Sequence, residues 1–429
     1  MRHPADPSEL RRGLLADRRD CWLLLLAIVA ATIDFAGVSW WTGGAKPFGD
    51  EQRWLTVLLQ AAYIAANASR VGGLVRACPA FLALVAFCAA SAAWSVSPAT
   101  SILGAVRLLL LGACIVLGQE RHGGGLLRRI FLATLVALVI ANLAMLAIPS
   151  RSIMDGTLAG AFRGLTDHKN TLGQVCALAL AFVLAAWPET AERRPALLLA
   201  AALVLATVAL TRSATAAVLS ATAIGVFATE GFVHRCRLPL LASLVLASAA
   251  AALGLLALTG LLHPLAAVGR DPTLTGRSDI WAFVDAYVRE RPWLGFGYRA
   301  FPLADLLRAD PRWGGDSYIV GTTHNAYVAI VSELGYVGLS AYAAWVVALV
   351  AGGFLRGDRA GRLCATMVLG VYLVSGLTES FAGLAPGLYL AGLLIAIPPA
   401  GGGTRRLNPL LSSAGYAERK RSRPVARTM

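Results

Sequence analysis

Long apolar stretches separated by short polar turns dominate this sequence. An α-helix needs about 20 apolar residues to cross a bilayer. The clearest stretches of that kind are residues 21–40, 101–118, 130–148, 197–210, 238–262 and 325–355. Weaker stretches lie at residues 54–68, 79–94, 171–187, 213–229, 361–380 and 386–400. The pattern predicts an all-α polytopic membrane protein with about twelve transmembrane helices.

One long interruption separates two of these stretches, from about Leu262 to Thr323. Within it, apolar residues recur with the period of one helix face, at Ile280, Phe283, Val284, Tyr287 and Val288. This spacing predicts an amphipathic helix lying on the outer surface, with Thr275 or Ser278 as its N-cap and Pro292 at its end. Gly295 and Gly297 then predict a sharp turn.

Composition and charge agree with a membrane protein. Hydrophobic residues make up 57% of the chain and charged residues 14%, which excludes an ordinary soluble domain. Arginines alternate between turns, as expected if the basic turns are cytoplasmic, and this places both termini in the cytoplasm. The same bias and anionic lipid headgroups explain most of the net charge of +14, so we expect no nucleic-acid partner. The first apolar stretch has no small-residue cleavage site, and we expect it to remain as a span.

Metal and disulfide chemistry find little support in the sequence. The seven cysteines show no CxxC or Cys/His ligand spacing, which argues against structural disulfides and a zinc site. The predicted outer loops contain no DxD motif or carboxylate cluster. We therefore expect an activity without a metal or other cofactor.

Polar residues gather in the predicted outer segments. The first, RGLTDHKNTLGQ, places Arg163, Asp167, His168, Lys169 and Asn170 just before an apolar stretch. One interpretation is a solvated helix start with Asp167 or Asn170 as the cap and Lys169 among lipid headgroups. The other is a rim of side chains that anchors a substrate. The residues leave both open.

Two arginines stand on the outer side, where the charge pattern otherwise avoids basic residues. Arg212 occupies a short turn in ALTRSATAAV, and Arg277 stands at the start of the predicted amphipathic helix. Arg212 fits lipid headgroups or an anion site, and the anion site is favoured because the residue breaks the charge asymmetry. The N-terminus beside Arg277 itself favours anions.

The segment GTTHNAYVAIVSELGYVG, residues 321–338, places a histidine and an asparagine at the start of a long apolar stretch. If the helix begins at His324, then His324, Tyr327, Val331, Gly335 and Gly338 share one face. Small residues on that face predict close packing of another helix near mid-membrane. His324 would then point into a cleft at the outer surface, although a single histidine is usually structural.

Together these residues form a chemically coherent set. Arginine binds phosphate in a forked geometry, so Arg212 and Arg277 suit a lipid diphosphate. Histidine can accept a proton from a hydroxyl at neutral pH, and nearby arginines would keep it neutral. The set predicts glycosyl transfer from a lipid-diphosphate sugar. A transporter would need polar residues through mid-membrane, where Arg107 is the chief exception, and a scaffold would not need the set at all.

Four motifs in order resemble the O-antigen ligase and polysaccharide polymerase superfamily: RGLTDHKNTLG, TRSATA, GRSDIWAFVDAYVRERPWLGFGY and THNAYVAIVSELGYVGLSAY. The resemblance covers residues 160–340. It implies an inverting, metal-independent GT-C glycosyltransferase of the bacterial inner membrane whose site faces the periplasm. The implied donor is an undecaprenyl-diphosphate-linked glycan, and the acceptor stays open among lipid A core, another lipid-linked glycan and a protein.

The resemblance also implies residue roles. Arg212 and Arg277 match the arginines that bind the diphosphate, and His324 matches the histidine proposed to activate the acceptor hydroxyl. Further substrate-binding candidates are Arg163, His168, Lys169, Asn170 and Asn325. The HKN segment resembles polymerases as much as ligases, so the acceptor stays open.

The resemblance and the apolar pattern together predict four parts of the chain. Residues 1–261 would hold transmembrane helices 1 to 9, residues 262–323 a large periplasmic loop, and residues 324–400 helices 10 to 12. Residues 401–429 would form a basic, disordered cytoplasmic tail.

Overall fold

The computed structural model describes residues 19–32, 51–188, 191–235, 277–310, 322–356, 359–380 and 383–397. Across these residues all regular elements are helices, and an isolated β-bridge pairs Ile153 with Phe162. The all-α prediction is therefore confirmed for the described part. The predicted span at 238–262, the predicted cap at Thr275 and the predicted disordered tail at 401–429 lie outside the described residues.

The described helices coincide with the predicted apolar stretches. After a helical segment at residues 19–32, the helices in these stretches are α2 (Glu51–Ala66), α4 (Pro79–Ala90), α5 (Pro98–His122), α6 (Gly124–Ala144), α8 (Lys169–Ala186), α9 (Arg194–Thr211), α10 (Ala214–Arg235), α15 (Ala326–Arg356), α16 (Arg359–Thr378) and α17 (Leu388–Ala396). The helices outside them are α3 (Val71–Ala77), α7 (Pro149–Ser152), α13 (Arg277–Glu290) and α14 (Leu303–Ala309).

Among the described residues, 6 helices are long and apolar enough to cross a membrane, or up to 7 if the bent pair α3 and α4 counts as one span. The pair bends by 97° at its junction. These helices indicate a multi-pass membrane protein. The predicted total of about twelve spans stays a prediction.

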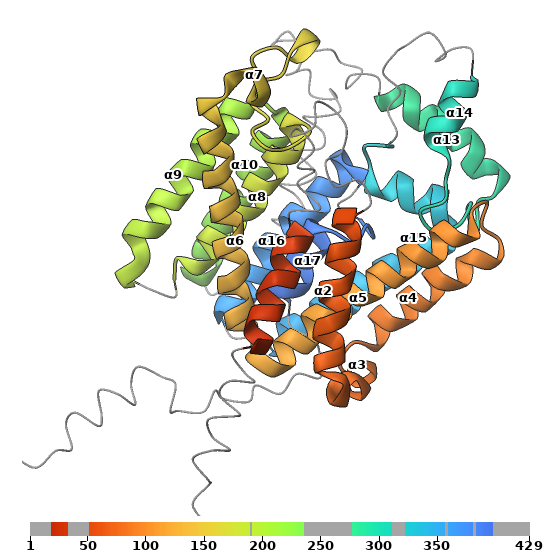
Figure 1. The fold of residues 1–429 in the computed structure, drawn as a ribbon, viewed down its shortest axis with the longest axis horizontal. Helices are drawn as coiled ribbons and strands as arrows, with labels where there is room; N and C mark the ends of the chain where they lie inside the picture. The colour runs from red at the N-terminus through yellow and green to blue at the C-terminus, as the bar shows by residue number, and fades with distance from the viewer. Residues whose placement is uncertain are drawn as a thin grey trace, which may run out of the picture.

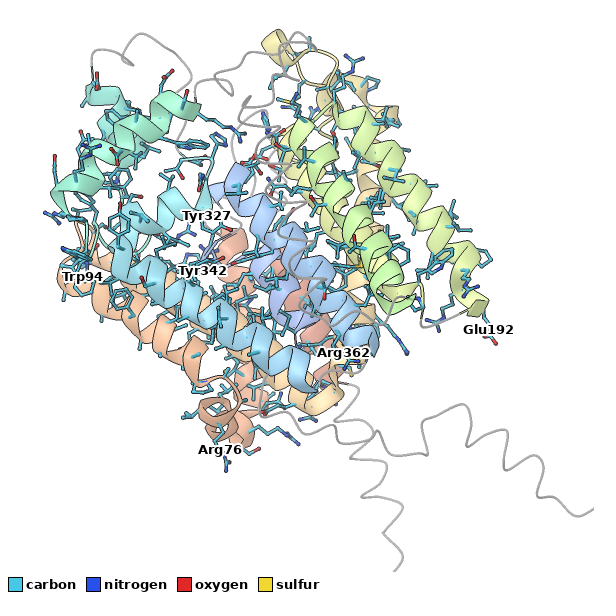
Figure 2. The ribbon with its side chains drawn as sticks, turned by 180° about the vertical axis from the view of Figure 1, so that it is seen from behind. Arg76, Trp94, Glu192, Tyr327, Tyr342 and Arg362 are labelled. Carbon is cyan, nitrogen blue, oxygen red and sulfur yellow. The ribbon has the colours of Figure 1, made fainter. Side chains whose placement is uncertain are left out.

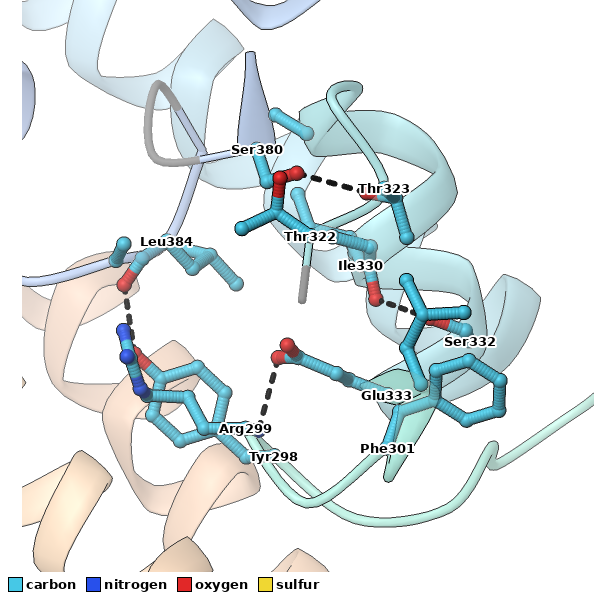
Figure 3. Close-up of a pocket in the computed structure, with 14 residues that line it drawn as sticks. Tyr298, Arg299, Phe301, Thr322, Thr323, Ile330, Ser332, Glu333, Ser380 and Leu384 are labelled. Carbon is cyan, nitrogen blue, oxygen red and sulfur yellow. Dashed lines mark hydrogen bonds between the residues drawn. The ribbon is translucent and has the colours of Figure 1, made fainter. Parts of the chain in front are cut away.

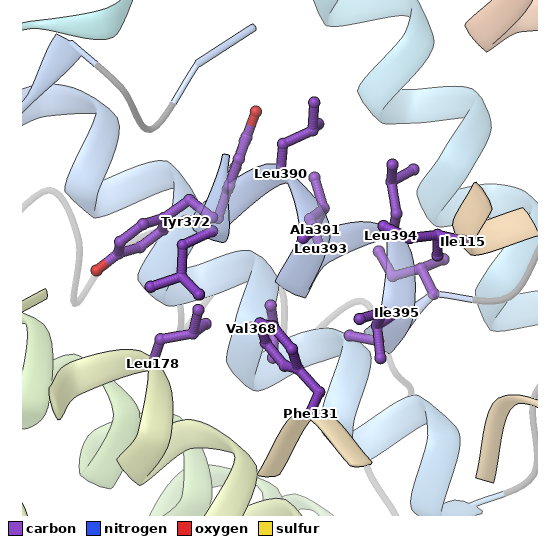
Figure 4. Packing of buried hydrophobic residues seen from close by; sticks show 14 of the residues in the cluster. Ile115, Phe131, Leu178, Val368, Tyr372, Leu390, Ala391, Leu393, Leu394 and Ile395 are labelled. Carbon is purple, nitrogen blue, oxygen red and sulfur yellow. The ribbon is translucent and has the colours of Figure 1, made fainter. Parts of the chain in front are cut away.

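Helix α8 packs against α6, α9, α10 and α16, in the left part of the view in Figure 1. Its side chains are buried along nearly its whole length, including Leu178 at 0% exposure. Figure 4 shows Leu178 in the apolar core with Phe131 of α6, Val368 of α16 and Leu390 of α17. Because α8 is packed on all sides, the polar residues at its N-terminus are held in fixed positions.

The predicted outer segments lie at one end of the bundle. Helices α7, α13 and α14 lie at the upper end in Figure 1, and α3 lies at the lower end. Figure 2, drawn from behind, shows Arg76 and Arg362 at that lower end. These positions are consistent with the predicted arrangement of basic turns at one end of the bundle. Which end faces the periplasm stays a prediction.

Helix α13 is amphipathic, as predicted, and it ends at Glu290, before Pro292. Its buried residues Ile280, Phe283, Val284 and Val288 pack with Leu303 and Leu307 of α14 and against Val328 and Val331 of α15. The apolar face therefore contacts protein, whereas the sequence predicted a helix lying on the outer surface. Ser278 lies inside α13 and is not its N-cap.

The continuous helix predicted from His324 through Gly338 is wrong. His324 has φ 47 and precedes α15, so its side chain does not follow the helical face. Gly335 has φ 67 and ψ −171, and α15 consists of two helical segments joined at this residue. The shared face and the mid-membrane depth inferred for Gly335 both depended on an unbroken helix.

The loop after α13 pairs with the break in α15. Phe296 N donates to Ser332 O at 3.0 Å and Gly297 N to Glu333 O at 2.7 Å. In return, Tyr336 N donates to Pro292 O at 2.8 Å and Val337 N to Trp293 O at 3.2 Å. Backbone groups that the break frees are thus satisfied by another backbone, as an apolar environment requires. Gly335 is a site of close approach, but to this loop and not to a helix.

Candidate active site

The buried carboxylate of Glu379, just after α16, contacts three of the predicted polar residues. Its Oε2 lies 3.1 Å from Nδ1 of His324. Its Oε1 accepts a hydrogen bond of 3.3 Å from Nδ2 of Asn170 and lies 3.5 Å from an Nη of Arg277. The side chain of Glu379 is 2% exposed and that of His324 is 28% exposed. These four residues, the Glu379 cluster, therefore join a buried acid to an accessible imidazole.

His324 is held by its chain neighbours. Asn325 Oδ1 accepts hydrogen bonds from the backbone N of Tyr327 at 2.9 Å and of Val328 at 3.1 Å, so Asn325 caps α15. Thr323 Oγ1 contacts Ser380 Oγ at 2.8 Å, which joins this segment to the residue after Glu379. A histidine with positive φ costs of order 1–3 kcal/mol, and such strain gathers at functional sites. The contacts of Thr323 and Asn325, on either side of His324, hold the backbone in this conformation.

Arg277, the first residue of α13, contacts the end of α16. Its Nη1 donates to Thr378 O at 2.7 Å, and Nη2 contacts Glu379. The guanidinium has five N–H donors, and these contacts use two of its nitrogens. Its side chain is 16% exposed. Within the described residues, no further hydrogen bond uses the remaining donors, which lie at the start of α13, where an anion is favoured.

His168 caps α8, because its Nδ1 accepts a hydrogen bond of 3.2 Å from Asn170 N. The expectation that Asp167 or Asn170 would cap this helix is therefore wrong. Asp167 instead accepts from Thr171 Oγ1 at 3.0 Å. Burial lowers the pKa of His168, against the opposing effects of Asp167 and Glu379, which keeps Nδ1 available as an acceptor.

Asn170 is a bridge within this region. Its Oδ1 accepts a hydrogen bond of 2.7 Å from Ser213 Oγ, while its Nδ2 reaches Glu379. Both sides of the amide are thus used. Asn170 thereby connects the turn after α9 to the Glu379 cluster.

Arg212 lies at the rim of the same region. It is exposed, ends α9 with φ 50 and ψ 30, and its backbone O accepts from Lys169 Nζ at 3.4 Å. Its guanidinium lies against Gly160, where a Cβ would come within 2.8 Å of it. Arg212 is linked to Glu379 through Ser213 and Asn170, and within the described residues no contact joins its guanidinium to that carboxylate.

The remaining candidates lie farther from the cluster in the contact network. Arg163 Nε donates to Arg151 O at 3.0 Å, within the loop before α8. Arg107 lines a small cavity with Gln60, Pro386 and Gly387. In the described residues neither side chain has a hydrogen bond or ion pair to Glu379 among those that define the cluster.

Sequence reasoning missed Glu379. The segment SGLTES, residues 375–380, had one usable signal, a carboxylate that ends an apolar stretch. A charged residue at such a depth is costly unless paired, and it is often functional.

These features define a helical, multi-pass membrane protein with an Asn, Arg, His and Glu cluster at one end of the bundle. Residues 197–343 match a family described as O-antigen ligase. The chain is 26% identical over 265 residues to the exopolysaccharide production protein ExoQ of Rhizobium meliloti (strain 1021). That match covers 57% of this chain and 58% of the relative, a little more than half of each.

The two matches support the O-antigen ligase and exopolysaccharide polymerase superfamily, which the four motifs also indicate. The matched family region includes Arg212, Arg277 and His324. Asn170 and Glu379 lie outside it. Their contribution to the cluster therefore comes from the fold.

Proposed function

We propose that this protein is a membrane glycosyltransferase that moves a glycan from an undecaprenyl-diphosphate donor to an acceptor hydroxyl at the periplasmic face, with inversion and without a metal. The contact of 3.1 Å between His324 and Glu379, beside Arg277 on the same carboxylate, carries the proposal. It joins a candidate base to a candidate anion-binding group. The superfamily supports a glycosyltransferase-type enzyme.

Glu379 orients His324 for proton transfer. When Nδ1–H donates to the carboxylate, Nε2 carries the free lone pair and can accept a proton. A carboxylate that fixes the tautomer in this way also stabilises the imidazolium that forms. His324 therefore acts as the general base, and Glu379 is its positioning residue.

The transfer exchanges one bond for another. The acceptor oxygen attacks the anomeric carbon while its proton passes to His324 Nε2. The bond between the anomeric carbon and the diphosphate oxygen breaks, and its electron pair leaves with the diphosphate. Attack opposite the leaving group inverts the anomeric centre.

The leaving diphosphate needs positive charge at the membrane boundary. Arg277 supplies N–H donors that its contacts with the described residues leave open, next to the first turn of α13. Arg212 and Lys169 lie together at the rim and extend the basic region. His168 and Asn170 shape the rim through the α8 cap and the bridge to Glu379.

Two acceptors fit this chemistry. In a ligase the acceptor is lipid A core, and in a polymerase it is another lipid-linked glycan. The polymerase is a specific alternative because ExoQ is named for exopolysaccharide production. A transporter is less well supported, since Asn170, Arg277 and Glu379 all stand at helix ends among the described residues, and not along a path through the bundle.

The test replaces the wild type in its host with His324→Ala and measures the size of the glycans on the undecaprenyl carrier. Long chains with an uncapped surface acceptor would indicate a ligase, and single repeat units would indicate a polymerase. Glu290→Gln, on the exposed end of α13, is the control for expression and insertion. If the His324→Ala strain carries wild-type glycans both on the undecaprenyl carrier and on the surface acceptor, the proposal is contradicted.

A further inference from the structure

A cavity of about 250 Å³ adjoins the Glu379 cluster (Figure 3). Thr323 and Ser380, the chain neighbours of His324 and Glu379, form part of its wall. Their hydroxyls contact each other at 2.8 Å. The cavity therefore begins one residue away from the proposed base and its positioning residue, although none of the four cluster residues lines it.

Glu333 supplies a carboxylate to this cavity. Figure 3 shows its side chain directed toward the space bounded by Ser380, Leu384 and Phe301. Oε2 accepts a hydrogen bond of 2.8 Å from the backbone N of Arg299. That bond orients the carboxylate and leaves Oε1 facing the cavity as an acceptor.

The other walls combine aromatic and hydroxyl groups. Tyr298 and Phe301 present rings, and Thr322 and Ser332 contribute hydroxyl-bearing side chains. The volume is below the roughly 300–1,000 Å³ of pockets for drug-sized ligands, so the cavity suits one ring and not an extended chain. A carboxylate on the wall favours a ligand with several hydroxyl donors, and Arg299, which also lines the cavity, can donate to the ring and hydroxyl oxygens of such a ligand.

We propose that this cavity is a sugar subsite that binds one pyranose ring of the glycan substrate, with Glu333 accepting hydrogen bonds from its hydroxyls. The inference rests on the proposed glycosyl transfer, and it adds separate binding sites for two parts of the substrate. The diphosphate binds at Arg277, and the sugar ring binds at Glu333. The segment that holds Thr323 and His324 lies between the two.

The experiment measures two binding constants on the full-length protein in lipid nanodiscs. One probe is undecaprenyl diphosphate without a glycan. The other is the oligosaccharide released by mild acid from the host's own carrier-linked pool. The variants are Glu333→Gln, which can keep the bond to Arg299 N, and Thr322→Trp, which fills the cavity from an exposed position. Glu290→Gln is the matched control.

We expect Glu333→Gln to weaken oligosaccharide binding about 10- to 100-fold, as for loss of a charge-assisted hydrogen bond. Thr322→Trp weakens it at least as much, and both variants bind undecaprenyl diphosphate like the wild type. Oligosaccharide binding that is absent from the wild type, or equal in wild type and Glu333→Gln, would overturn the sugar subsite. Arg277→Lys tests the diphosphate site. If this variant binds undecaprenyl diphosphate like the wild type, the diphosphate site at Arg277 is contradicted, whereas the sugar subsite at Glu333 is not affected.

Discussion

Gly335→Ala tests the backbone pairing that joins the loop after α13 to α15. Gly335 has φ 67 and ψ −171, a backbone region that is essentially restricted to glycine. A Cβ at this position would overlap the backbone carbonyl of Trp293. Gly295, with φ 63, faces the break from the other side, where a Cβ would lie 2.6 Å from the backbone carbon of Glu333. Neither segment, 292–297 or 332–337, can move away without breaking the four hydrogen bonds between them.

The cost has two parts. A non-glycine residue in this conformation costs of order 1–3 kcal/mol, and forcing an extra carbon into packed structure costs typically about 1–3 kcal/mol. We expect Gly335→Ala to lower the free energy of unfolding by about 2–6 kcal/mol. Gly225→Ala is the matched control, because a Cβ added to Gly225, in α10, would have no other atom within 4 Å. It should be neutral or stabilising by up to about 1 kcal/mol.

The assay is unfolding in mixed micelles titrated with SDS, followed by circular dichroism. Turnover of a lipid-linked glycan is measured in parallel, because the loop also sets the end of α13 and the wall of the sugar cavity. If Gly335→Ala and Gly225→Ala unfold within about 0.5 kcal/mol of each other, the tight pairing at the break is refuted.

Three further substitutions address the Glu379 cluster and the α8 cap. Arg277→Lys keeps the charge and loses the fork, so carrier affinity should fall about 10-fold in a binding titration, and an unimpaired variant would exclude bidentate binding. Glu379→Gln should lower single-turnover rates about 10²- to 10⁴-fold with a smaller effect on carrier binding, and a wild-type rate would remove the positioning role. His168→Asn keeps a capping acceptor without a titrating ring. Because burial lowers the pKa of His168, the unfolded state takes up a proton at this residue at a higher pH than the folded state does, and wild-type stability should fall as pH drops through about 6.5. In thermal unfolding, the melting temperature of His168→Asn should therefore fall less between pH 7.5 and 5 than that of the wild type.

Local patterns predicted the helices well, because each depends on a contiguous run of side chains. The apolar stretch predicted at 361–380 corresponds to α16. Ile280, Phe283 and Val284, which recur with helical spacing, form part of the buried face of α13. The direction of that face was wrong, because the sequence alone does not show whether lipid or protein covers an apolar stripe. Here α14 and α15 cover it.

The sequence by itself determined the membrane class, and it predicted three candidate site residues, Arg212, Arg277 and His324. Only the tertiary structure decided which of them meet. Glu379 lies 55 residues beyond His324 and 209 beyond Asn170 along the chain, and these three residues come together because α8 and α15 both pack against α16. The break at Gly335 was equally hidden, since a glycine in an apolar run fits a packed helix as well as a kink. Its conformation is set by hydrogen bonds to residues 292–297, which no local pattern encodes.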